Sequence, residues 1–87
     1  MKNSIIIGFE ENSWIFKERN QLSSEEEYIF QKPATGGRDL IKCSFYFPSK
    51  DVFIEEEIPS IVGESKVLFD GKITTMDDLR ILNRMLF

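Results

Sequence analysis

Two adjacent glycines, Gly36 and Gly37, lie between two runs of β-prone residues and limit the possible folds of this chain. Glycine accepts the positive φ angles that the tightest hairpin turns require. A turn centred on this pair sets Tyr28 opposite Phe45. One face of the hairpin is then almost wholly apolar, and a shift of one residue would mix the two faces. The apolar face carries Tyr28, Phe30, Ile41, Cys43, Phe45 and Phe47, and the other carries Glu27, Ile29, Gln31, Lys42, Ser44 and Tyr46.

A second turn, over residues 48–51, leads to a predicted strand over residues 52–58. If Phe47 lies opposite Val52, the apolar side chains of this strand continue the apolar face. The alternate positions then extend the mixed face of the hairpin, and they are Phe53, Glu55 and Glu57.

This register makes specific cross-strand pairs. It sets Tyr46 opposite Phe53 and Lys42 opposite Glu57. Glu56 is the misfit, because it points toward the apolar face. Either a bulge re-aims this carboxylate or it lies at a sheet edge near water.

The first third of the chain has weaker signals. We predict strands over residues 4–10 and 13–17, joined by a tight turn near Glu11 and Asn12. The polar residues 18–25 then form a loop.

The end of the chain changes from a strand to a helical pattern. Residues 66–69 predict a short strand. Thr74 or Thr75 can cap a helix that begins with Asp77 and Asp78 and runs to the last residue. This helix has an apolar stripe formed by Leu79, Ile81, Leu82, Met85 and Leu86.

Together these elements predict one α+β domain over residues 1–87. It contains an antiparallel, meander-like sheet of about five to six strands, with one C-terminal helix packed on one face. The helical stripe is expected to cover the apolar face, although it could also bind a partner helix or a second copy.

The missing residue types exclude several chemistries. The chain has no His and one Cys, so the usual zinc sites and His-dependent nucleophiles cannot be built. We therefore expect no enzyme activity, no cofactor and no metal. Cys43 points inward and is expected to be an inert core residue. A lone cysteine favours a reduced, cytoplasmic compartment, and no run approaches the length of a membrane span.

The charge is negative and clustered. The formal net charge is −4, and two glutamate triplets occupy residues 25–27 and 55–57. Such a chain is repelled by phosphate backbones and anionic lipid, whereas a basic protein is attracted. We therefore expect no direct nucleic-acid partner and no membrane partner.

The mixed sheet face is the candidate partner-binding site, because aromatic anchors inside a charged rim are typical of protein interfaces. The sequence predicts a small acidic, non-enzymatic binding protein. An inhibitor of a basic nuclease-type protein fits this description, either an immunity protein or antitoxin, or a phage-type inhibitor. The N-terminal hairpin could instead cover the rings. The candidate residues are Glu27, Ile29, Tyr46, Phe53, Glu55 and Glu57.

Other functions stay open at this point. The chain could be a homo-oligomeric structural or assembly subunit, such as a homodimer, that associates through a strand edge or the mixed face. A small carboxylate enzyme would use Glu56. A nucleic-acid binder running through Lys32, Arg38 and Lys42 is the least favoured.

Overall fold

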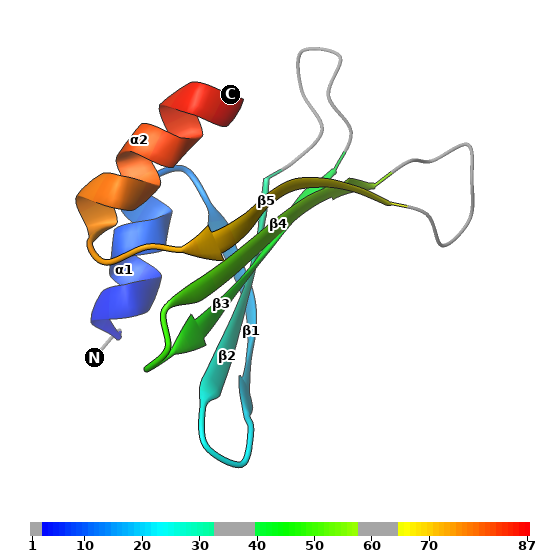
Figure 1. Cartoon of the computed structure of the whole chain (residues 1–87). Coiled ribbons are helices and arrows are strands. Elements are labelled where there is room, and N and C mark those ends of the chain that lie inside the picture. Colours follow the sequence, from blue (N-terminus) through cyan, green and yellow to red (C-terminus); the bar gives the residue numbers. More distant parts are fainter. Residues whose placement is uncertain (1–2, 33–39, 58–64) are drawn as a thin grey trace.

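The computed structural model describes residues 3–32, 40–57 and 65–87. Figure 1 shows one antiparallel sheet, with strands in chain order and both helices on the same side. The predicted α+β meander with a C-terminal helix is therefore confirmed. The elements are α1 (Ser4–Glu11), β1 (Ile15–Gln21), β2 (Glu26–Lys32), β3 (Ile41–Phe47), β4 (Asp51–Glu57), β5 (Ser65–Lys72) and α2 (Met76–Leu86).

The central hairpin has the predicted register. Tyr28 lies opposite Phe45, and Phe30 opposite Cys43. The predicted turn at Gly36 and Gly37 lies outside the described residues. The pairing of β2 with β3 nevertheless sorts their side chains onto the two faces as the sequence predicts.

The apolar face, called the inner face below, is the core of the molecule. Phe9 of α1 stacks on Phe30 with ring centroids 4.1 Å apart, and α2 buries Leu79 and Leu82 against the same cluster. Cys43 is fully buried there, as predicted. Phe47, at the end of β3, does not join the core, because 40% of it stays exposed. Ile81 and Met85 of the predicted α2 stripe also stay exposed, so the stripe covers the inner face only in part.

The N-terminal segment is a helix, so the predicted strand over residues 4–10 is wrong. Its isoleucines have high strand propensity, but tertiary packing overrides such propensities. The Asn3 side chain caps the helix by accepting from the Ile5 N–H at 2.7 Å. Helical spacing then places Ile5, Ile6 and Phe9 against the core.

The predicted strand over residues 13–17 is present in part, because β1 begins at Ile15. The helix ends at Glu11, and Ser13 adopts a φ of 71° before β1 begins. The predicted loop over residues 18–25 is right only for residues 22–25, because β1 continues to Gln21 before the short turn to β2. Polar cross-strand pairs stabilise this edge strand, such as the ion pair of Arg19 with Glu26.

The register between β3 and β4 is two residues away from the prediction. Val52 lies opposite Phe45 rather than Phe47, and Phe53 lies opposite Ser44 rather than Tyr46. The turn causes this difference, since Lys50 adopts a φ of 66° and its N–H donates to the Tyr46 carbonyl at 2.7 Å. A shift of two residues leaves every side chain on its predicted face.

Both edge strands carry a bulge. β1 has one extra residue at Lys17 relative to β2, and β5 has one at Leu68 relative to β4. The second irregularity lies beside Ile54 and Glu55, directly before Glu56. Glu56 itself is half-buried and lies opposite Ile41 and Lys66.

Helix α2 begins as predicted. Thr75 is the N-cap, and its side chain and that of Asp78 form a reciprocal capping box. The helix ends at Leu86, one residue before the predicted end. Within the described part of the chain, neither helix has the length and apolar character that crossing a bilayer requires.

Candidate protein-binding face

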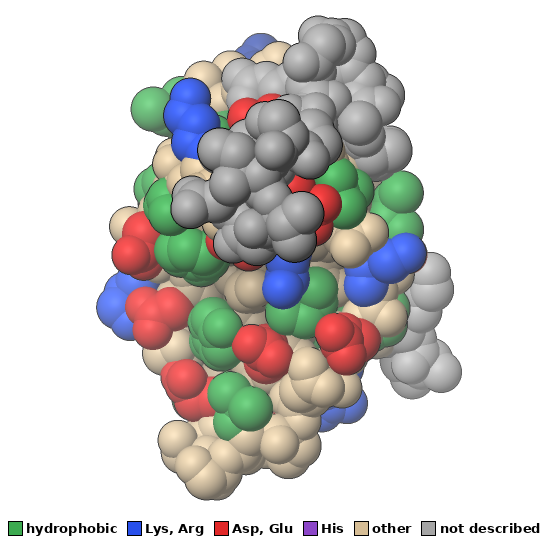
Figure 2. All heavy atoms as spheres, turned by 90° about the vertical axis from the view of Figure 1, so that its right-hand side faces the viewer, with side chains coloured by type: hydrophobic (Ala, Val, Ile, Leu, Met, Phe, Trp, Pro, Cys, Tyr) green, Lys and Arg blue, Asp and Glu red, His purple; other side chains and the backbone are tan. Residues whose placement is uncertain are grey.

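The outer face is the side of the sheet that points away from α1 and α2 (Figure 1). No helix of the described residues covers it. Figure 2 shows this side, where acidic and apolar side chains alternate over the strands. The strand registers place on it the carboxylates of Glu18, Glu27, Asp51, Glu55, Glu57 and Asp70 and the lysines Lys42 and Lys72.

All the predicted site residues lie on this face, but they do not contribute equally. Glu57 is exposed, and Glu27, Tyr46, Phe53 and Glu55 are half-buried. The remaining one, Ile29, is only 6% exposed. It therefore forms the floor of the face and offers little surface to a partner.

The Tyr46 hydroxyl is fixed by a carboxylate on the neighbouring strand. It donates to Glu27 Oε2 at 2.8 Å, while Asn20 Nδ2 donates to Glu27 Oε1 at 3.0 Å. Burial, followed by the hydrogen bond to Glu27, raises the pKa of Tyr46. The ring is thus held in a neutral, oriented state in the free protein.

The second glutamate triplet is divided between the faces. Glu55 lies opposite Lys42 and accepts a hydrogen bond from the Ser65 hydroxyl at 2.9 Å. The Glu57 backbone N–H donates to the Leu40 carbonyl. The Glu57 side chain is exposed at the end of β4. Glu56 points to the inner face, so only two of the three carboxylates join the outer face.

A shallow depression of about 470 Å³ lies on the outer face. Two rings and three carboxylates surround it, and its lining residues are Glu25, Tyr46, Asp51, Val52, Phe53 and Asp70. This combination suits a cation, because the carboxylates attract the charge and the rings add cation–π contacts.

The three carboxylates of this depression were not among the predicted site residues. Asp51 lies two residues before Phe53, so strand alternation alone could have placed it on the outer face. Asp70 lies opposite Phe53 only because of the β4–β5 register, which the sequence does not specify. Glu25 is held by the turn, where it accepts from the Ser49 N–H at 3.3 Å.

The depression is not a uniform negative field. Lys72 Nζ lies 2.7 Å from Asp51 Oδ1, and the hydrogen bond from this lysine is the main cause that lowers the pKa of Asp51. Lys72 therefore keeps Asp51 ionised and neutralises part of its charge. Asp70, on β5, is exposed and supplies a further carboxylate to the rim.

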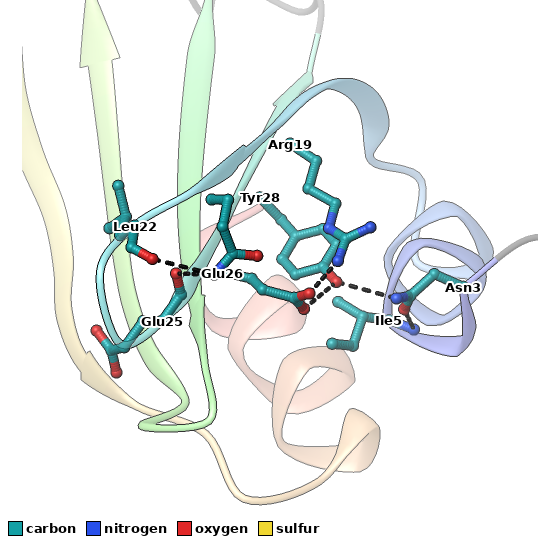
Figure 3. Close-up of polar contacts among 8 residues, drawn as sticks. Asn3, Ile5, Arg19, Leu22, Glu25, Glu26 and Tyr28 are labelled. Carbon is teal, nitrogen blue, oxygen red and sulfur yellow. Dashed lines mark hydrogen bonds and ion pairs between the residues drawn. The ribbon is translucent and has the colours of Figure 1, made fainter.

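A second polar cluster lies at the edge of the inner face (Figure 3). The Tyr28 hydroxyl donates to Glu26 Oε2 at 2.8 Å and accepts from Asn3 Nδ2 at 2.9 Å. Glu26 also pairs with Arg19, and the bonds from Tyr28 and Arg19 lower its pKa. Because Asn3 caps α1, this cluster attaches the start of α1 to β1 and β2.

The structure also bears on the basic residues of the nucleic-acid-binding alternative. Lys32 and Lys42 lie on opposite faces of the sheet. Lys32 is directed to the inner side, where its Nζ lies 4.8 Å from the centre of the Trp14 ring and donates to the Asn12 carbonyl at 3.2 Å. Arg38 lies outside the described residues. The two lysines thus do not form one basic surface.

The described carboxylates do not form a metal site. In residues 3–32, 40–57 and 65–87, no group of three or more His, Cys, Asp or Glu side chains is arranged to hold an ion. Burial raises the pKa of the Cys43 thiol far above its ordinary value, so this thiol is unreactive at neutral pH.

Comparison with known proteins gives no match to a family model, a curated protein or a solved structure. The function of this chain therefore has to be inferred from its fold and its outer face.

Proposed function

We propose that this protein is a small, non-enzymatic binding protein whose outer face engages a basic protein. One observation carries the proposal: no described helix covers this face, and carboxylates on β1, β2, β4 and β5 surround two aromatic rings there. An uncovered sheet face that needed only solubility would not require the rings of Tyr46 and Phe53. Rings inside a polar rim are the usual anatomy of an interface.

The depression beside these rings suits one anchor residue of the partner. A lysine or arginine side chain from the partner would reach Asp70 and Glu25 with its charged end and lie against Phe53 with its stem. Such anchoring residues in a desolvated centre carry much of the binding energy of many interfaces. The surrounding glutamates would speed association by attracting positive charge at a distance.

The class of partner follows from this chemistry. Proteins that act on nucleic acids carry positive clefts for phosphate, and a face with clustered carboxylates can occupy or flank such a cleft. We propose inhibition of a nuclease-type toxin or another nucleic-acid-binding enzyme, in the manner of an immunity protein, an antitoxin or a phage-type inhibitor. A reduced cytoplasmic compartment would suit this function and the lone Cys43.

The test compares wild-type protein with variants of the outer face in capturing the partner from the native host. Wild-type protein is expected to capture a basic protein and to inhibit its action on nucleic acid. Replacing Glu55 and Glu57 together with Lys, or Tyr46 and Phe53 together with Ala, should abolish capture while far-UV circular dichroism stays unchanged.

A matched control separates the face from overall charge. Replacing Glu10 and Glu11 with Lys makes the same change in net charge at exposed positions of α1, and capture should survive. If the outer-face variants capture the partner as well as wild type does, the proposed face is wrong.

A further inference from the structure

An apolar groove lies on the opposite side of the molecule from the outer face, between α2 and the end of β5. It has a volume of about 300 Å³ and a mostly apolar lining, with Lys72 and Asp78 at its rim. The apolar residues that line it are Leu68, Phe69, Ile73, Ile81, Leu82, Met85 and Leu86.

Two of these lining side chains protrude at the edge of the groove. Met85 is 77% exposed and Ile81 is 49% exposed, although both belong to the apolar stripe of α2. Leu79 and Leu82 of the same helix pack into the core, whereas Met85 and Ile81 do not. A protruding knob next to a groove on the same patch is the shape that a two-fold symmetric interface requires.

We propose that this patch is a homodimer interface, in which α2 packs antiparallel against α2 of a second copy. A two-fold axis beside Ile81 would place Met85 of each chain in the groove of the other. The interface is separate from the outer face, and the proposal does not depend on the proposed function.

The charges of α2 favour a second copy of the chain as the molecule that binds this patch. Asp77 and Arg84 are seven residues apart, so they lie on the same flank of the helix. Asp77 Oδ1 lies 3.6 Å from Arg80 Nε of its own helix, and both groups stay exposed. In an antiparallel pair centred near Ile81, Asp77 of one chain lies beside Arg84 of the second copy, and the reverse contact forms by symmetry. The helix therefore has complementary charges toward itself, with its acidic first turn and its basic last turn.

The strand edges are poorer routes to self-association. β1 and β5 each contain a bulge, which interrupts the row of backbone groups that a second sheet would pair with. A contact through α2 needs no strand pairing. It leaves the outer faces of both copies open.

Sedimentation velocity over a range from about 10 µM to about 1 mM tests the proposal, since small interfaces associate at such concentrations. The mass is expected to rise from 10.2 kDa toward twice that value. Met85→Glu should raise the dissociation constant at least about tenfold, because a charge replaces an apolar anchor. Leu22→Glu, at an exposed leucine in the β1–β2 turn, should leave it unchanged.

Cross-linking supplies a second readout in case Met85→Glu disturbs the fold. The axis passes near residue 81, so Ile81→Cys should form a disulfide-linked dimer under mild oxidation, and Leu22→Cys should not. The native Cys43 is fully buried and does not compete. A mass of one chain at every concentration, or a dimer that Met85→Glu and Ile81→Glu both leave intact, would overturn the proposal.

Discussion

The two faces of this sheet are built from the same strands but differ in burial. On the inner face, Phe30, Cys43 and Ile54 are fully buried under α1 and α2. On the outer face, Ile29 and Ser44 are buried in the floor, whereas Lys42, Tyr46, Phe53 and Glu55 are half-buried. Side chains there are held by hydrogen bonds such as that of Tyr46 with Glu27. The strands therefore specify two surfaces, and the helices determine which one becomes the core.

An aromatic residue has a different role on each face of this sheet. Phe30 is stacked against the ring of Phe9 in α1, whereas Phe53 lies among carboxylates. Burial of the first stabilises the fold. The second contributes less to the fold, so its presence on an uncovered face favours a role in binding.

The largest expected effect is on the inner face. Phe30→Ala should lower the free energy of unfolding by about 3–5 kcal/mol, because removing a fully buried ring leaves a cavity beside Phe9 and Phe16. Urea denaturation of the variant and wild type measures it. A loss below about 1 kcal/mol would show that the inner face is not the core.

A second test concerns α1, the element that closes the inner face. A Cβ atom at Gly8 would lie 2.6 Å from Met76 Sδ of α2, so the two helices meet closely there. Gly8→Val should cost about 1–3 kcal/mol by overpacking, measured by thermal unfolding. Adding Met76→Ala should recover part of this loss, and no recovery would contradict the contact.

The matched change on the outer face should be small. Phe53→Ala is expected to cost about 1 kcal/mol or less, because this ring is half-buried and leaves no closed cavity. Urea denaturation beside Phe30→Ala gives the direct contrast between the faces. Equal losses for the two variants would mean that the outer face is also packed against something in the free protein.

The smallest effect concerns pH. The pKa of Glu26 is lowered by its bonds with Tyr28 and Arg19, so its contribution to stability is present above its ordinary value of 4.5 and is lost as pH falls below it. The stability gap between wild type and Glu26→Gln should therefore narrow from about pH 7 to about pH 3. A gap of constant size in urea denaturation would contradict this interpretation of the cluster in Figure 3.

The sequence predicted the sheet well because side-chain alternation is a strong constraint. The register from Tyr28 and Phe45 followed from the need to keep one face apolar. The β3–β4 register was missed by two residues, since alternation repeats every two residues and cannot detect such a shift. For the same reason the predicted outer-face residues were still placed together.

The helix α1 could not be predicted in the same way. The run of Ile5, Ile6 and Ile7 fits a strand as well as a helix, and its length does not decide between them. The helix is stabilised by the contact of Phe9 with Phe30, which joins residues far apart in the sequence. The depression was missed because Asp70 reaches it through a strand register that only the structure gives.

In the proposed function, the outer face binds the partner and the helical side does not. Hydroxyl-radical footprinting of the captured complex tests it directly, because it reports on individual side chains. At equal protein concentration, we expect the partner to protect Tyr46 and Phe53 while oxidation of Met85 is unchanged. Protection of Met85 with Tyr46 and Phe53 as reactive as in the free protein would contradict it.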